Sequence, residues 1–240
     1  MKTKIDKSLS VILPVYNEGF LLEEAVDRLL TSLSENFMDY ELIIVDDGNN
    51  DENQEIIERL RANHEDIKII RNIINLNLGI SIQRGFASAE KDLLVFNSAD
   101  LPLSPDDLRY FAEKIGMADM LVLERKIYAG ATLWRRFASR INLLILKILF
   151  PFASKGMKDL NYTFLFKRTI LKDILPLAKS PVFTQPEMIL RAVYKKYKVR
   201  STPADYHARK QGKGAFGKPH DILWSLYDML RFRIIKWLVK

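Results

Sequence analysis

The segment ELIIVDDGNND, residues 41–51, decides the fold of this chain. Four consecutive aliphatic residues, 42–45, are followed by two aspartates, a glycine and two asparagines. A short continuous apolar run rich in Ile and Val is typical of a strand that is buried on both faces, as in a parallel sheet. The segment therefore predicts a parallel α/β fold, and it places acids at the end of a buried strand.

The first hundred residues repeat this pattern. Further apolar runs that end in polar residues lie at residues 9–16, 67–71 and 92–96. Between the runs, apolar residues recur at helical spacing over residues 21–33 and, more briefly, over residues 56–60. Strands that alternate with helices predict a doubly wound, Rossmann-like half, in which ligands bind beyond the carboxyl ends of the strands.

The second half of the sequence is less regular. It is predicted to contain strands at 120–125, 159–166 and 198–203 and helices at 132–150, 185–196 and 221–239. The last helix has an apolar stripe made of Leu223, Leu226, Tyr227, Leu230, Ile234, Trp237 and Leu238. Its opposite side carries Ser225, Asp228, Arg231, Lys236 and Lys240. We expect one α/β domain over residues 1–218, followed by a basic amphipathic helix over residues 219–240.

Composition excludes several classes of protein. The chain has 240 residues, which is enough to bury one large core. It has no cysteine, which excludes disulfides and thiolate metal sites. The longest apolar run, 143–152, includes Lys147 and Pro151 and is shorter than the roughly 20 residues that span a bilayer. We therefore expect no membrane span and, from the form of the N-terminus, no signal peptide.

Positive charge is concentrated at the C-terminal end. Residues 191–240 contain 13 Lys and Arg against 3 Asp and Glu, whereas residues 1–190 contain 24 against 27. Such an end predicts an anionic partner, whether a phosphate ligand, a lipid headgroup or nucleic acid; the alternative is an ordinary solvated surface. We expect no nucleic acid, because the C-terminal aromatic residues lie within the apolar stripe instead of on a stacking surface.

Polar residues follow three of the predicted strands. They are Pro14 to Glu18, Asp46 to Asp51 and Asn97 to Asp100. Acids and amides at the ends of parallel strands can bind a base and a ribose, or can hold a hard cation. For residues 46–51 alone, a turn and a helix N-cap are an equal alternative. Three such strand ends together favour a nucleotide site.

Four segments carry a family resemblance: LSVILPVYNE, YELIIVDDGNND, NLNLGISIQRG and LLVFNSADL. Their order and spacing resemble the inverting family 2 glycosyltransferases of the GT-A fold. The resemblance continues through ERKIYAGATLWRRFASRINLL, DLNYTFLFKR, FTQPEMILRA and PADYHARKQGKG, so that it covers about residues 8–215. It is strongest to polyprenyl-phosphate sugar synthases, such as dolichyl-phosphate mannose synthase. It implies a mixed sheet and the transfer of a sugar from a nucleotide sugar to a polyprenyl phosphate with inversion.

The resemblance also assigns a donor site. The residues expected to bind the nucleotide are Pro14, Tyr16, Glu18, Asp46, Asp47, Gly79 and Ser98. The family's DxD motif, which binds a divalent metal on the diphosphate, falls on Ser98-Ala99-Asp100, so Asp100 is the expected metal ligand and a catalytic residue. Because Ser98 replaces the first acid, Mg²⁺ or Mn²⁺ should bind less tightly unless phosphate and water complete the coordination. The alternative is a site in which Arg or Lys neutralises the diphosphate.

On the acceptor side, the resemblance places the lipid phosphate on Arg125, Arg135 and Ser139, with both arginines catalytic. A basic loop that includes Arg209 and Lys213 is expected to close on phosphates. The arginine fork is always charged and binds phosphate bidentately. Since a phosphate acceptor is already ionised at neutral pH, no general base is needed. The alternative for Arg135 is a solvated helix face.

Two other functions are open from the sequence. If the acceptor were a sugar hydroxyl, Glu187 would be the candidate base, although a carboxylate at a helix start is favourable without any catalytic role. A protein with an altered metal motif could also bind a nucleotide or a lipid phosphate without turnover.

In the favoured function the protein is cytoplasmic and peripheral, with its terminal helix and residues 143–152 on the cytoplasmic face of a membrane. The alternative is that the apolar stripe packs on the protein's own core.

Overall fold

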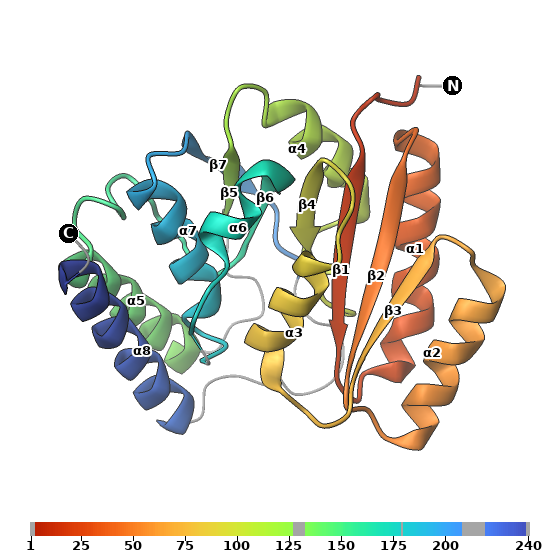
Figure 1. The fold of residues 1–240 in the computed structure, drawn as a ribbon, viewed down its shortest axis with the longest axis horizontal. Helices are drawn as coiled ribbons and strands as arrows, with labels where there is room; N and C mark the ends of the chain where they lie inside the picture. Colours follow the sequence, from red (N-terminus) through yellow and green to blue (C-terminus); the bar gives the residue numbers. More distant parts are fainter. Residues whose placement is uncertain (1–2, 127–132, 179, 208–218, 239–240) are drawn as a thin grey trace.

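A single mixed sheet organises the molecule (Figure 1). The computed structural model describes residues 3–126, 133–178, 180–207 and 219–238. Within them, seven strands lie in the order β3-β2-β1-β4-β6-β5-β7. Their bounds are β1 Leu9–Val15, β2 Tyr40–Asp47, β3 Ile67–Asn72, β4 Leu93–Phe96, β5 Met120–Arg125, β6 Thr163–Lys167 and β7 Val199–Ala204. Strand β6 is antiparallel to β4 and β5, and the other pairs are parallel.

Helices cover both faces of the sheet. Their bounds are α1 Gly19–Asn36, α2 Asp51–Asn63, α3 Asn77–Ala87, α4 Leu108–Lys114, α5 Leu133–Leu149, α6 Leu171–Ile174, α7 Thr184–Tyr194 and α8 Pro219–Leu238. Successive side chains of β1 point to opposite faces, so Leu13 packs on the side of α1 and α4, and Ile12 packs on the side of α3 and α7. Burial on both faces explains why β1, β2 and β4 are nearly continuous apolar runs.

The strand order reverses beside β1. The chain builds β1, β2 and β3 toward one edge and then returns to place β4 on the other side of β1. Asn97, the first residue after β4, donates its backbone N–H to the Ile12 carbonyl at 2.9 Å. Ligands of doubly wound sheets bind at such a switch point, outside the carboxyl ends of the strands. The fold therefore directs attention to the loops after β1, β2 and β4.

The predicted doubly wound half and mixed sheet are confirmed. The strand predicted at 159–166 is partly wrong, because it begins only at Thr163. The preceding segment is irregular, with Asp159 accepting a hydrogen bond from the backbone N–H of Asn161 at 3.0 Å. Helices α3, α4 and α6 lie where no helix is predicted. The division into residues 1–218 and 219–240 stays a prediction.

Helix α8 is attached by its polar side. Ser225 and Asp228, which lie opposite the predicted apolar stripe, are buried, and Asp228 is only 4% exposed. The Asp228 carboxylate accepts the Ser180 N–H at 2.8 Å, and Phe232 packs its ring against Phe150. The described residues of the predicted stripe are exposed: Leu223, Leu226, Tyr227, Leu230 and Ile234. The alternative that the stripe packs on the protein's own core is therefore wrong for these residues.

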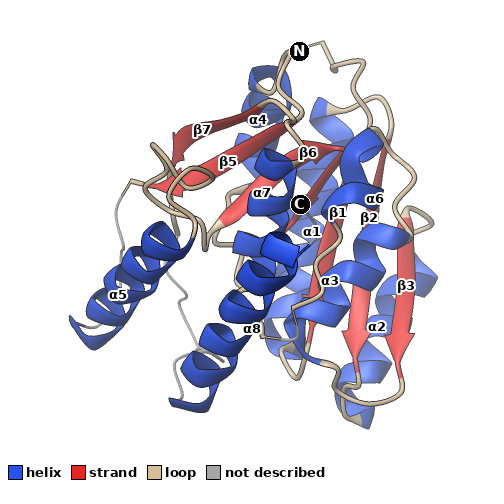
Figure 2. Ribbon diagram, turned by 60° about the vertical axis from the view of Figure 1, so that its left-hand side comes forward, coloured by secondary structure: helices blue, strands red, loops and turns tan. Residues whose placement is uncertain are grey.

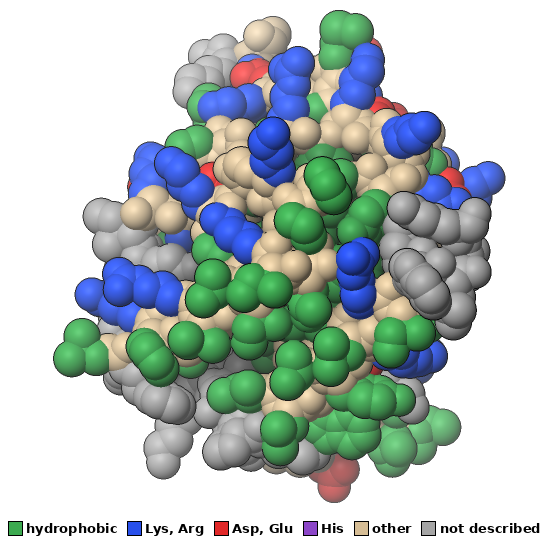
Figure 3. All heavy atoms as spheres, turned by 90° about the vertical axis from the view of Figure 1, so that its left-hand side faces the viewer, with side chains coloured by type: hydrophobic (Ala, Val, Ile, Leu, Met, Phe, Trp, Pro, Cys, Tyr) green, Lys and Arg blue, Asp and Glu red, His purple; other side chains and the backbone are tan. Residues whose placement is uncertain are grey.

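Helix α5 lies beside α8 (Figure 2). It also turns an apolar stripe outward. Its exposed apolar side chains are Leu133, Phe137, Ile141, Leu144 and Ile148, and Phe152 follows the helix. We call the exposed stripes of α5 and α8 the apolar face. Figure 3 shows apolar side chains gathered on this side of the molecule, with Lys and Arg beside them. None of the helices in the described part of the chain has both the length and the hydropathy to cross a membrane.

Candidate active site

Asn49 ties together the ends of β1 and β2. Its Nδ2 donates to the Val15 carbonyl at 2.9 Å and to Asp46 Oδ1 at 2.6 Å, and its Oδ1 accepts the Asn17 N–H at 2.6 Å. Asn17 has a φ of 52°, a left-handed conformation that asparagine tolerates. These bonds fix the two loops that leave the carboxyl edge of the sheet at β1 and β2.

The two acids predicted to bind the nucleotide are buried and hydrogen-bonded. Asp46 accepts a bond from Arg71 Nε at 2.8 Å, and this bond raises the pKa of Arg71. Asp47 accepts bonds from Asn72 Nδ2 and from the Leu76 N–H, both at 2.8 Å. Both carboxylates therefore hold the walls of the site in place. Their contacts with a base and a ribose stay predictions.

The turn after β2 is closely packed. Gly48 has a φ of 73°, and a Cβ there would lie 2.5 Å from the Ile74 carbonyl carbon, so only glycine fits. Asn50 caps α2, because its side chain accepts the Asn53 N–H at 3.1 Å. The turn and N-cap that the sequence offered as an alternative are therefore present, and they are compatible with a ligand at the same edge.

The remaining donor candidates lie near the same strand ends. Pro14 is buried within β1, Tyr16 follows it and is 48% exposed, and Glu18 is half-buried at the start of α1. Gly79 is buried in the first turn of α3, which follows β3. Their roles in binding a nucleotide stay predictions.

Asn97 holds the loop that carries Ser98 and Asp100. Its Nδ2 donates to the Leu103 carbonyl at 2.8 Å, and its Oδ1 accepts the Ser98 N–H at 3.1 Å. The Leu101 N–H donates to the Ser98 carbonyl at 2.8 Å, and Leu101 has a φ of 45°, which is uncommon for a residue other than glycine. Such backbone conformations persist where the surroundings fix them, and they cluster at functional sites.

Ser98 orients the carboxylate of Asp100. Its hydroxyl donates a hydrogen bond to Asp100 Oδ1. The serine that replaces the first acid of the motif is thus a neutral donor in contact with the remaining acid. No group of three or more Asp, Glu or His side chains in the described residues could hold a metal. A cation at Asp100 would therefore take most of its remaining ligands from phosphate oxygens and water.

Arg125 is fixed at the end of β5. Its Nε and Nη2 donate to the two carboxylate oxygens of Asp159 at 2.5 Å and 2.9 Å. Its guanidinium carbon lies 5.6 Å from the ring centre of Tyr162 and 5.5 Å from that of Tyr206. The Tyr162 hydroxyl is 2.7 Å from the Pro102 carbonyl oxygen, and burial raises the pKa of Tyr162, so the phenol keeps its proton. The structure thus brings Arg125 together with the loop of Asp100.

A second link reaches α5. Asn161, two residues after Asp159, accepts a bond from Asn142 Nδ2 at 3.0 Å. Ser139 lies one turn before Asn142 on the same side of α5 and is half-buried. The Arg135 side chain, like Arg209 and Lys213, lies outside the described residues. The structure therefore connects two of the predicted acceptor residues, Arg125 and Ser139, through one polar segment.

Glu187, the alternative base, is used inside the protein. It is 2% exposed at the start of α7. Its two oxygens accept the Leu177 N–H at 3.0 Å and the Ala178 N–H at 2.7 Å, and Arg191 Nη2 lies 2.6 Å from Oε1. These contacts favour a structural carboxylate over a base for a hydroxyl acceptor.

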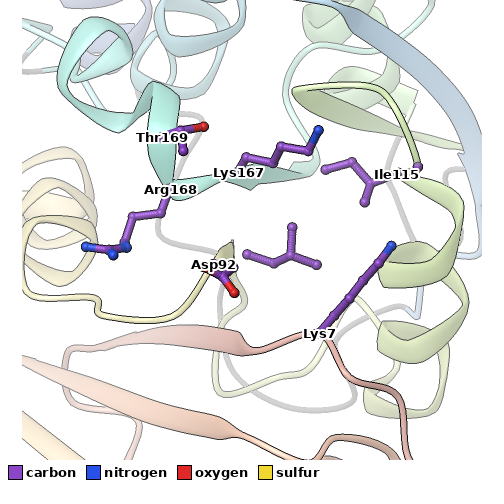
Figure 4. Close-up of a pocket in the computed structure, with 8 residues that line it drawn as sticks. Lys7, Asp92, Ile115, Lys167, Arg168 and Thr169 are labelled. Atoms are coloured by element: carbon purple, nitrogen blue, oxygen red, sulfur yellow. The ribbon is translucent and has the colours of Figure 1, made fainter.

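The structure also contains a cavity of about 510 Å³ that is separate from this edge (Figure 4). Lys7, Asp92 and Lys167 line it. Lys7 precedes β1 and Asp92 precedes β4, whereas Lys167 ends the antiparallel strand β6. The cavity therefore lies at the amino edge of the parallel strands, opposite the candidate active site.

A doubly wound half with polar loops at its switch point is the arrangement at which α/β proteins bind their ligands. The sequence profile of glycosyl transferase family 2 matches residues 10–175. The chain belongs to this family, as the resemblance predicted.

Two curated proteins illustrate what the chain is similar to. An undecaprenyl-phosphate 4-deoxy-4-formamido-L-arabinose transferase from Proteus mirabilis is 35% identical over 147 residues, which are 60% of this chain and 44% of the relative. A dolichol-phosphate mannosyltransferase from Pyrococcus furiosus is 26% identical over 237 residues, which are 95% of this chain and 64% of the relative. The chain spans about half the length of the curated relatives it matches.

Solved structures support the fold. Glucosyl-3-phosphoglycerate synthase from Mycobacterium tuberculosis, in complex with Mn²⁺, UDP-glucose and phosphoglyceric acid, superposes with a TM-score of 0.70. The match has 15% sequence identity and covers 95% of this chain and 80% of that chain. This likeness and the family membership confirm the predicted GT-A fold.

Proposed function

We propose that this protein transfers a sugar from a nucleotide sugar to a polyprenyl phosphate. The observation that carries the proposal is the position of Arg125, a side chain suited to phosphate that is fixed by Asp159 and linked through Tyr162 to the loop of Asp100. Relatives named as sugar transferases to undecaprenyl phosphate and dolichol phosphate support this acceptor. The nucleotide sugar binds at the carboxyl edge of β1, β2 and β4.

The proposed reaction is a single displacement. A phosphate oxygen of the acceptor attacks the anomeric carbon, and the bond from that carbon to the nucleoside diphosphate breaks with inversion. The attacking oxygen is already ionised, so no side chain has to remove a proton. Arg125, with Arg135 and Ser139, holds the attacking phosphate, and Asp100 serves the departing diphosphate. When bound at Asp100, Mg²⁺ or Mn²⁺ supplies positive charge that stabilises the leaving group.

Calorimetric titration with UDP and GDP tests the donor half of the proposal. We expect one of the two nucleotides to bind in the presence of Mg²⁺ or Mn²⁺, and to bind at least about tenfold more weakly in EDTA, because a cation held by Asp100 would offset the charge of the diphosphate. The matching sugar nucleotide is then incubated with farnesyl phosphate, and the product is identified by mass spectrometry.

The outcomes separate the alternatives. Nucleotide binding without any product would support a binding protein without turnover. Product formation that is unchanged by EDTA would show that basic side chains neutralise the diphosphate. If neither nucleotide binds under any condition, the proposal is wrong.

We further propose that the apolar face rests on a membrane, with the protein peripheral at its cytoplasmic face. The acceptor's polyprenyl chain is itself dissolved in lipid, so its phosphate is presented at the surface that such a face would touch. Exposed cations border the apolar face: Arg136, Arg140, Lys147, Arg231 and Arg233. Helix α5 contains no acid. Cations beside an apolar surface favour the anionic headgroups of a bilayer over a neutral protein partner.

Substituting both Leu144→Glu and Leu223→Glu should prevent vesicle binding. The two leucines are 55% and 68% exposed, and each would leave water on insertion. Loss of both contributions should weaken binding to vesicles of phosphatidylglycerol and phosphatidylcholine by about a hundredfold or more. Co-sedimentation measures this change. Met117→Glu, at an exposed apolar residue after α4 and outside the apolar face, is the matched control. Equal binding of the double variant and the control would contradict the proposal.

A further inference from the structure

We propose that Asp159 is a positioning residue of the acceptor-phosphate site, which it builds by holding Arg125 in one orientation. The inference rests on the proposed function and adds a residue that no sequence motif assigned. Asp159 is 4% exposed, so its charge is compensated inside the protein, and Arg125 is the cation that compensates it.

The guanidinium of Arg125 contacts a carboxylate along one edge and lies over two aromatic rings. Asp159 occupies the Nε and Nη2 edge with a bidentate contact. The rings of Tyr162 and Tyr206 lie within the range of cation–π contacts, and they meet each other edge to face at a centroid distance of 5.6 Å. An arginine has five N–H donors, and a bidentate carboxylate occupies two of them.

Asp159 is itself held by the segment that connects the acceptor elements. Its Oδ1 accepts the Asn161 N–H at 3.0 Å, and the Asn161 side chain bonds both Asn142 of α5 and the Val182 carbonyl. Segment 159–161 therefore joins β5, which carries Arg125, to α5, which carries Ser139. A shift of Asp159 would change the distance between these two predicted phosphate contacts.

Tyr162, which follows Asn161, fixes the distance between the acceptor site and the donor site. The Tyr162 hydroxyl lies 2.7 Å from the Pro102 carbonyl oxygen and 3.0 Å from that of Asp205. The His207 N–H donates to the same Pro102 carbonyl at 3.0 Å. Pro102 lies two residues after Asp100, in the same loop. The single segment 159–162 therefore contacts both Arg125 and the loop that carries Asp100. Such control of position is what a displacement between two bound reactants requires.

Two physical effects of Asp159 oppose each other, and their opposition allows a test. As a charge, Asp159 partly neutralises Arg125, so its removal should strengthen phosphate binding. As a positioning residue, it orients the fork, so its removal should weaken phosphate binding. We expect the loss of orientation to outweigh the gain in charge. The sign of the change in acceptor affinity therefore separates positioning from simple electrostatics.

The test is the substitution Asp159→Asn, which keeps the size of the side chain and removes one charged acceptor. We expect the KM for farnesyl phosphate to rise about tenfold or more, with the KM for the sugar nucleotide unchanged within about twofold. Asp159→Glu restores a bidentate carboxylate and should recover part of the loss. Asp173→Asn is the control, because Asp173 is also paired with a cation, Lys195 at 3.5 Å, but lies on α6.

Thermal unfolding and direct titration with farnesyl phosphate accompany the kinetics. The inference would be overturned if the acceptor KM of Asp159→Asn were unchanged or lower, or if the donor and acceptor KM rose equally. In either case, turnover by the wild-type protein would still support the proposed function. A wild-type protein that neither binds nor uses the lipid phosphate would overturn both. A lower midpoint of unfolding together with an unchanged acceptor KM would assign Asp159 to stability alone.

Discussion

Substituting Asp100→Ala should lower the rate of sugar transfer by about a thousandfold, which is the size of effect expected when charge stabilisation of a leaving group is lost. Asp100 is the only acid left in the motif at residues 98–100. Removing it takes away the carboxylate that would hold a cation on the diphosphate. The loss should appear in kcat, because that charge develops fully only as the diphosphate departs.

Two substitutions of Ser98 accompany this prediction. Ser98→Ala removes the hydroxyl that orients Asp100 and should cost less than Asp100→Ala, about tenfold, because the carboxylate itself remains. Ser98→Asp restores a second acid and should lower the Mn²⁺ concentration needed for half-maximal rate. If Asp100→Ala keeps more than about a tenth of the wild-type rate under saturating metal, the leaving group depends on other groups.

Substituting Arg125→Ala should raise the KM for the lipid phosphate by about a hundredfold, and Arg135→Ala should do the same, because charged hydrogen bonds to the phosphate are lost. Affinity for the nucleotide should be nearly unchanged in both variants. Kinetics with farnesyl phosphate and calorimetry with the nucleotide measure the two quantities. Equal losses in both assays would refute the assignment of the arginines to the acceptor.

Arg125→Ala needs a structural control, because it leaves the carboxylate of Asp159 buried and unpaired. Breaking a buried pair in this way costs about 3–5 kcal/mol of stability. The double substitution Arg125→Gln with Asp159→Asn replaces the pair by two amides that can hydrogen-bond each other. The double variant should recover most of the lost stability. Its affinity for the acceptor should stay as low as that of Arg125→Ala. Recovery of acceptor affinity in the double variant would show that Arg125 is structural.

The sequence was sufficient for the strands of the first half of the fold, whereas helix α3 was not predicted. Strands buried on both faces are nearly continuous apolar runs, and this makes β1, β2 and β4 visible without partners, whereas β3 at the sheet edge is only partly buried. The parallel arrangement then follows from the alternation with helices, and it places Asp46 and Asp100 at one edge. The same argument was weak for the strand predicted at 159–166, where Asp159 and Asn161 interrupt the run with side chains that serve loops.

The polar cross-links could not be predicted in the same way. Asn49 bonds to Val15, and Asp159 bonds to Arg125, each across 34 residues of sequence. Such pairs have no periodicity, and only the finished topology brings them together. The terminal helix shows a related limit. Its apolar and polar sides can be assigned from helical spacing, but which side meets the protein depends on partners such as Ser180.

The strand order also bears on how specificity can change during evolution. The residues expected to bind the donor all lie in the first hundred positions, and those expected to bind the acceptor phosphate all lie after position 124. Within the sheet, the two stretches meet at one antiparallel pair, β4 with β6. Recombination between related genes after Asp100 and before β5 would therefore exchange one whole half-site and keep the other intact. A new sugar and a new lipid can thus be acquired in separate genetic events.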